Sequence, residues 1–348
     1  MYKQQGIQAG VLAVVASFSG LAGAADIDID LPQVYGRADV SIHSSTVGDE
    51  DRVISTESNA SRFGLQNTHR LQENVYVFYR LEYEVNFDER LRSSERNFLR
   101  ARNSYVGLRN SLGEIFVGIH DTPLKMAEQK VDLFSDAYLA DIDNVLTGQD
   151  RVSDTINLRV KVPGNVSLWA MLIPGEGESP EAGSDAAQGD STDALSFSAS
   201  GEIAGVSLVL AYNSDLNSAE ILRLSAQGKV GPVQLGALVQ QGEAVGAESD
   251  SGLAYVLSAA YKLGEKNVIK LQYTAAENDM LADVSRDQNG DGLPDVDEAQ
   301  LFTLGLDHKL AKSTKVYTYY SQRVVDGAEA EEYDTFGVGL RHEFGNKK

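Results

Sequence analysis

The stretch Val75–Phe87, VYVFYRLEYEVNF, carries the pattern that decides the fold. Its side chains alternate with a period of two, so an extended strand puts the apolar ones on one face and the charged ones on the other. The first face holds Val75, Val77, Tyr79, Leu81, Tyr83, Val85 and Phe87, and the second holds Tyr76, Phe78, Arg80, Glu82, Glu84 and Asn86. A strand this long with one apolar and one charged face suits a wall between lipid and water, because strands of soluble sandwiches are usually shorter.

The same alternation recurs along the chain and predicts sixteen strands. They are 32–44, 54–68, 72–88, 97–110, 113–120, 151–162, 165–173, 192–202, 205–214, 218–229, 232–243, 251–263, 266–277, 299–311, 314–323 and 332–344. An even number is typical of a bacterial single-chain barrel. The expected fold class is therefore all-β, a sixteen-stranded antiparallel transmembrane β-barrel.

The connections between these strands fall into two length classes. The short ones are 110–112, 163–164, 203–204, 231–232, 264–265 and 312–313. The long polar ones are 45–53, 89–96, 121–150, 174–191, 278–298 and 324–331. Short turns at one end and long loops at the other are typical of a transmembrane barrel, whereas a soluble sandwich need not sort its loops this way.

Residues 1–24 have the layout of a secretory signal peptide. Lys3 gives a positive start, residues 10–21 are apolar, and Ala22-Gly23-Ala24 offers a cleavage site. We therefore expect an exported mature chain, 25–348, that forms a single barrel domain. No later stretch reaches the roughly 18 uncharged apolar residues that a spanning helix needs.

Composition excludes several classes of function. The formal net charge is −21, and a chain this acidic offers no basic face to nucleic acid. An exported chain without cysteine must be held together by packing or by a closed sheet. The five histidines show no zinc-binding spacing, and neither a nucleophile-elbow nor a phosphate-loop motif is present, which argues against an enzyme. A Ser/His site assembled in space remains open.

Five short segments resemble, in their order and spacing, the general bacterial porins, a trimeric family of sixteen-stranded barrels. They are VYGR at 34–37, SRFGL at 61–65, SYVGL at 104–108, GEIFVG at 113–118 and FGVGLRHEF at 336–344. The last segment resembles the family's closing strand, whose terminal aromatic residue resembles a signal for the barrel-assembly machinery. The family usually ends at that residue, whereas here 345–348 follow Phe344.

The resemblance implies a diffusion channel for small hydrophilic solutes and ions, with no catalytic activity. It also implies a homotrimer in the Gram-negative outer membrane, in contact with its lipid and lipopolysaccharide. In the family, a long loop such as 121–150 folds into the barrel and narrows it. The resemblance places Arg37, Arg62, Arg102 and Arg151 as a basic ladder on the wall opposite this loop, and the loop carries Asp132, Asp136, Asp141 and Asp143.

Strand parity independently places arginines in the lumen. If Phe63 and Leu65 face lipid, Arg62 faces inward. The same argument applies to Arg80, Arg100, Arg151 and Arg159, because an arginine facing the bilayer centre would cost about 2–4 kcal/mol. The predicted constriction residues are Arg37, Arg62, Arg80, Arg102, Arg151, Asp132 and Asp136. Opposed acids and bases there would set a transverse field across the water path.

Residues 287–298, DQNGDGLPDVDE, match the calcium-loop pattern D-x-[DN]-x-[DN]-G-x5-E. The predicted ligands are Asp287, Asn289, Asp291, the Leu293 carbonyl, Asp295 and Glu298. Strands rather than helices flank the motif, so we expect a weak structural Ca²⁺ site in the acidic loop 278–298; an acidic turn without metal is the alternative.

Three functions remain open from the sequence. The first is a general diffusion porin, and the second is a solute-specific channel of the same fold. The third is a secreted calcium-binding β-sandwich or adhesin that never enters a membrane. A need for detergent would favour either channel over the third.

Overall fold

A computed structural model describes residues 31–48, 51–87, 99–175, 194–217, 219–244, 251–282, 296–327 and 331–345. The predicted signal peptide lies outside these ranges. Within them, the helical segments are short: α2 (Pro123–Met126), η1 (Ile142–Asn144) and η2 (Asn278–Met280). No helix in this described part has the length and apolarity to cross a membrane.

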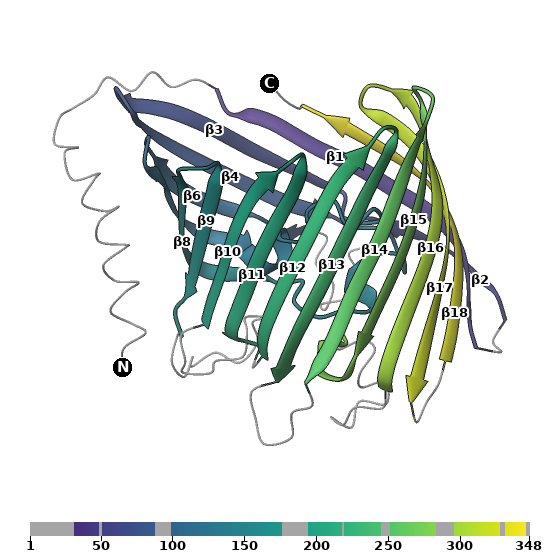
Figure 1. The fold of residues 1–348 in the computed structure, drawn as a ribbon. Coiled ribbons are helices and arrows are strands. Elements are labelled where there is room, and N and C mark those ends of the chain that lie inside the picture. Colours follow the sequence, from purple (N-terminus) through teal and green to yellow (C-terminus); the bar gives the residue numbers. More distant parts are fainter. Residues whose placement is uncertain are drawn as a thin grey trace, which may run out of the picture.

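The strand segments form one antiparallel sheet that closes on itself, and Figure 1 shows them following one another around the wall. They are β1 (Gln33–Val47), β2 (Val53–Ser58), β3 (Arg62–Gln72), β4 (Val75–Val85), β5 (Leu99–Ala101), β6 (Ser104–Arg109), β7 (Gly113–Asp121), β8 (Arg151–Val162), β9 (Val166–Ile173), β10 (Ala194–Ile203), β11 (Val206–Leu216), β12 (Ala219–Val230), β13 (Val233–Ala244), β14 (Gly252–Leu263), β15 (Asn267–Glu277), β16 (Val296–Ala311), β17 (Thr314–Gly327) and β18 (Glu331–Phe344). The last strand pairs back onto the first, from Gly36 opposite Phe344 to Val47 opposite Tyr333. This confirms the all-β class and the closed barrel of sixteen strands, two of which are each divided into two segments.

Both divided strands contain an extra residue. Val40 of β1 pairs with Ser58 of β2, and Arg37 of β1 pairs with Arg62 of β3. Between these two pairs, the chain from β2 to β3 has one residue more than β1. The partner of β4 is longer by one residue in the same way, in the stretch around Arg102 that separates β5 from β6. Such bulges bend a strand and redirect a side chain. The predicted strands 54–68 and 97–110 are therefore each broken beside an arginine.

Exposure alternates along the wall as the sequence pattern predicts. On β4, the Leu81 side chain is 48% exposed on the outer face, whereas its neighbour Glu82 is 6% exposed on the inner face. Outer positions elsewhere are also large and apolar, for example Leu224, Leu257 and Leu304. The outer face is therefore a continuous apolar surface of the kind that a lipid bilayer covers.

Residues 122–150, named here the lumen segment, lie against the inner face of the barrel. Leu124, Ile142 and Leu146 are fully or almost fully buried there. They share one apolar cluster with inward side chains of β11 to β17, such as Ile221 and Leu301. The inner face is therefore not polar throughout, as strict alternation would suggest, because the lumen segment excludes water from this part of the wall.

A glycine in the wall makes room for the lumen segment. A Cβ built on Gly305 of β16 would lie 2.6 Å from Cε1 of Phe134. Phe134 is buried, and its ring packs edge-on against Tyr319 of β17. The segment can approach the wall this closely because position 305 has no side chain.

Candidate functional site

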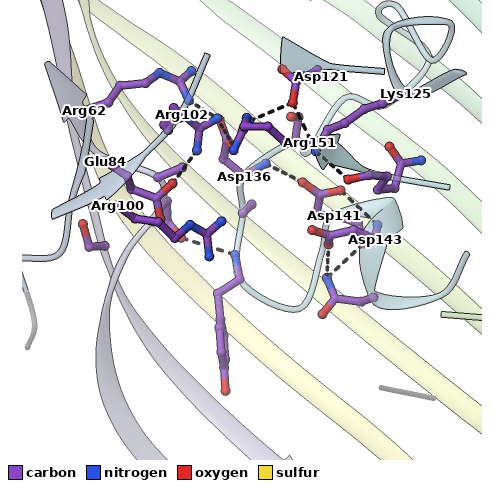
Figure 2. A pocket seen from close by; sticks show the side chains of 18 of the residues that line it. Arg62, Glu84, Arg100, Arg102, Asp121, Lys125, Asp136, Asp141, Asp143 and Arg151 are labelled. Atoms are coloured by element: carbon purple, nitrogen blue, oxygen red, sulfur yellow. Dashed lines mark hydrogen bonds and ion pairs between the residues drawn. The ribbon is translucent and has the colours of Figure 1, made fainter. Parts of the chain in front are cut away.

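Asp136 lies where the lumen segment reaches the arginines of β1, β3 and the bulge between β5 and β6. Its carboxylate is 2.8 Å from the guanidinium of Arg37, 3.5 Å from that of Arg62 and 4.0 Å from that of Arg102. Figure 2 shows Arg62, Arg102 and Asp136 converging from the wall and from the segment. The acid therefore contacts the basic ladder directly, whereas the sequence suggested acids facing it across a gap.

The backbone around Asp136 helps to aim its carboxylate. The residue has a φ of 66°, in the left-handed region that aspartate tolerates better than most residues. Its N–H donates to Oδ2 of Asp141, at 2.6 Å. Burial alone would raise the pKa of Asp136, but Arg62, Arg102 and Arg37 hold this pKa below its ordinary value. The carboxylate is therefore ionised at neutral pH.

The arginines are fixed by further partners on the wall. Arg102 donates to Glu82 at 3.2 Å and also bonds Glu84. Arg151 pairs with Asp121 at 2.9 Å, where β7 and β8 lie side by side. These charged hydrogen bonds restrict the guanidinium groups to fixed positions along the water path.

A cavity of about 430 Å³ lies between the lumen segment and this wall. Its lining is strongly charged on both sides, as Figure 2 shows. The segment contributes Lys125, Glu128, Asp136, Asp141 and Asp143, and the wall contributes Arg62, Arg100, Arg102, Arg151, Glu57, Glu84 and Asp121. A solute inside it would meet opposite charges at close range, as in a selectivity region of a channel.

A second cavity of about 310 Å³ is lined by Arg37, Arg62 and Arg80 among others. Because Arg62 lines both cavities, the Asp136 cluster lies between them. Arg80 donates to Gln66 at 2.9 Å and lies over the ring of Tyr35. The structure thus places the predicted residues Arg37, Arg62 and Arg102 together, with Arg151 and Arg80 in the adjoining cavities.

Asp132 is placed differently from the prediction. Its side chain is 7% exposed and accepts hydrogen bonds from the Phe134 N–H and from Gln272 of β15. It lines neither cavity. The sequence could not distinguish Asp132 from Asp136, because an irregular segment has no periodicity that shows which side faces the wall.

Several charged residues at the site were not among the predicted ones, and these include Lys125, Glu128 and Arg341. Lys125 and Glu128 belong to the lumen segment and line the larger cavity. Arg341 of β18 bonds the buried Asp39 of β1. Strand parity could have predicted that Arg341 faces the lumen, since its neighbour Leu340 is exposed on the outer face.

The predicted calcium motif lies mostly outside the described residues. Glu298 is described: it lies in β16, and its carboxylate accepts a hydrogen bond from Gln300 at 2.8 Å. Asp287, Asn289, Asp291, Leu293 and Asp295 lie beyond the described ranges. Among the residues that are described, no group of three or more His, Cys, Asp or Glu could hold a metal ion.

The sequence matches the family model for Gram-negative porins over residues 11–328. The chain belongs to the Gram-negative porin family. The porin is thus an outer-membrane channel for passive diffusion, and its family and fold indicate a channel rather than an enzyme. Among curated proteins, none matches this sequence.

Solved porin structures share the fold at low sequence identity. The anion-selective porin from Comamonas acidovorans is 19% identical with a TM-score of 0.69, and the match covers 90% of this chain and 99% of that porin. OmpF of Salmonella typhi, in complex with daunomycin, is 17% identical with a TM-score of 0.69, and 90% of this chain covers 97% of it. A trimer form of OmpT of Vibrio cholerae is 12% identical with a TM-score of 0.59, and 90% of this chain covers all of it.

The porin's charge preference is expected to depend on pH through Glu128. Burial and the neighbouring Asp141 raise the pKa of Glu128 to about 8, so its carboxyl gains a negative charge as the pH rises through that value. Reversal potentials under a salt gradient should shift towards cation preference between about pH 6.5 and about pH 9.5. In Glu128→Gln, the shift in reversal potential over this pH range should be smaller than in the wild type. Equal pH shifts in the wild type and Glu128→Gln would contradict the assignment.

Proposed function

We propose that the porin is a general diffusion channel for small hydrophilic solutes and ions, acting without catalysis. Its narrowest point is the cluster of Asp136 with Arg37, Arg62 and Arg102. One observation supports this most: Arg62 lines both lumen cavities and lies 3.5 Å from Asp136, so solutes moving between the cavities pass this cluster.

The charges at this cluster set the ion preference of the channel. Asp136 offsets part of the positive charge of three arginines, each of which is less than one-fifth exposed. In a narrow lumen with low-dielectric walls, such charges act on permeating ions much more strongly than surface charges do. Removing the carboxylate would leave an excess of positive charge at the narrowest point.

Asp136→Asn is therefore expected to shift the channel towards anions. We expect the ratio of chloride to potassium permeability to rise at least about twofold, because lumen charges focus the local field. Reversal potential in a planar bilayer under a salt gradient measures this ratio.

Asp326→Asn is the matched control, since this carboxylate is exposed at the end of β17 and lines neither cavity. It should leave the ratio unchanged. The assignment of the constriction fails if Asp136→Asn behaves like Asp326→Asn, and the channel function fails if the wild type gives no conductance steps.

We also propose that the porin is exported with a cleaved signal peptide, residues 1–24, and assembles as a homotrimer. The apolar segment before Ala22-Gly23-Ala24 supports the first proposal. The continuous apolar outer face and the trimer form of the related fold in Vibrio cholerae support the second. The porin's partners would be the barrel-assembly machinery during insertion, and lipid and lipopolysaccharide in the outer membrane. The mass of the mature protein, starting at Ala25 or Asp26, tests the cleavage.

The motif at 287–298 supports a further proposal, a weak structural Ca²⁺ site in the acidic loop. About 10 mM Ca²⁺ should stabilise the detergent-purified trimer by about 1–3 kcal/mol, for a dissociation constant typical of extracellular modules. Gel migration after graded heating, with and without Ca²⁺, measures this stability and the trimer together. Asp291→Ala should remove the Ca²⁺ response. No response in the wild type contradicts the site, and monomer in the unheated lane contradicts the trimer.

A further inference from the structure

The lumen segment is held at its two ends by one buried arginine. Arg223 of β12 is fully buried and donates to the Leu124 carbonyl at 3.0 Å, near the start of the segment. It also donates to the carbonyls of Thr147 at 3.1 Å and Gly148 at 3.4 Å, near the end of the segment. One guanidinium thus joins two stretches of chain that are far apart in sequence.

The approach of these two stretches is close. Gly148 has a φ of +83°, and a Cβ built on it would lie 2.7 Å from Cδ2 of Leu124 and 3.1 Å from Nη2 of Arg223. Only glycine fits this position without strain. The base of the segment is therefore packed around the guanidinium and has little room to rearrange while the guanidinium stays.

All the hydrogen-bond partners of Arg223 within the described part of the chain are neutral oxygens. Besides the three carbonyls, its Nε donates to Oε1 of Gln240 on β13, at 2.8 Å. Gln240 in turn donates to the Thr147 carbonyl at 3.2 Å. Arg223 lines neither lumen cavity, so its charge does not face the water path.

The lumen segment therefore runs from Arg223 on one part of the wall to the arginines around Asp136 on another. Its base is bonded to Arg223 on β12, and its Asp136 is bonded to Arg37 on β1. The cluster at Asp136 lines the two cavities, whereas Arg223 is buried and donates to backbone carbonyls of the segment and to Gln240. The arginines at Asp136 face the water path, whereas the direct contacts of Arg223 fix where the segment lies.

We propose that Arg223 is the positioning residue of the constriction: by joining the two ends of the lumen segment to β12, it keeps Asp136 at a fixed place in the water path. This proposal rests on the proposed channel function. Without Arg223, three carbonyls of the segment lose a charged donor, and the base of the segment can shift relative to the wall.

Arg223→Met tests this in planar bilayers, since it keeps an unbranched apolar stem and removes all the donors of the side chain. Spontaneous closures and open-channel noise should increase about tenfold, the factor expected for losing a hydrogen bond to a charged group. At about pH 6, where the Glu128 carboxyl is protonated with or without Arg223, the reversal potential should stay at the wild-type value while the channel is open. Arg223→Lys retains a charged donor, so its closures and noise should lie between those of Arg223→Met and the wild type.

Lys229→Met is the matched control. It removes one positive charge from the same strand, at an exposed position near the turn after β12, and should leave noise and closures unchanged. A second readout reports the segment itself. Because the chain contains no cysteine, a nitroxide on Ser135→Cys, an exposed site in the segment, can report mobility by spin-resonance spectroscopy. Its mobility should rise in Arg223→Met and stay constant in Lys229→Met.

Wild-type noise and nitroxide mobility in a folded Arg223→Met porin would overturn the positioning role. A shifted reversal potential with unchanged noise would also overturn it, because that result assigns an electrostatic role to Arg223. If Arg223→Met does not fold, Arg223→Lys decides by the same two readouts. Failure of the channel function itself looks different, since the wild type would then pass no current.

Discussion

Closure of the sheet between β1 and β18 is the constraint from which the other features follow. A bilayer supplies no water to unpaired N–H and C=O groups, so a wall of strands is stable in lipid only when its first and last strands pair. Here that pairing extends from Gly36 opposite Phe344 to Val47 opposite Tyr333. Once the wall is closed, each strand must direct alternate side chains to lipid and to the lumen.

A closed wall of sixteen strands encloses more space than its own inward side chains fill, and the lumen segment occupies part of this space. Its apolar side chains pack on inward residues such as Ile221 and Leu301, and Gly305 admits the ring of Phe134. Its polar backbone is bonded by Arg223, and its Asp136 by arginines elsewhere on the wall. Hydrophobic packing thus places the segment on one side of the lumen, and charge defines the passage that remains.

Most of the barrel wall and part of the site could be predicted from the sequence. Period-two alternation was sufficient for the closed barrel and for placing Arg62 and Arg80 inward, because parity depends only on the local chain. It could not reveal the bulges beside Arg62 and at Arg102, since one extra residue in a pair is visible only in the register of the partner. Nor could it distinguish Asp132 from Asp136 or predict the role of Arg223. The packing of an irregular segment depends on contacts distant in sequence, which strand periodicity does not show.

The structure requires that adjacent residues of one strand face hydrocarbon and water in turn. Leu65 and Gln66 of β3 test it most directly, since Leu65 lies on the exposed outer face and Gln66 lines the smaller cavity. The chain has no cysteine of its own, so Leu65→Cys and Gln66→Cys can each be labelled selectively in lipid vesicles. A charged thiol reagent should modify Gln66→Cys rapidly and leave Leu65→Cys unmodified, and a lipid-soluble quencher should reach a fluorophore only at position 65. Equal modification of the two cysteines would contradict a wall with one face in lipid and the other in water.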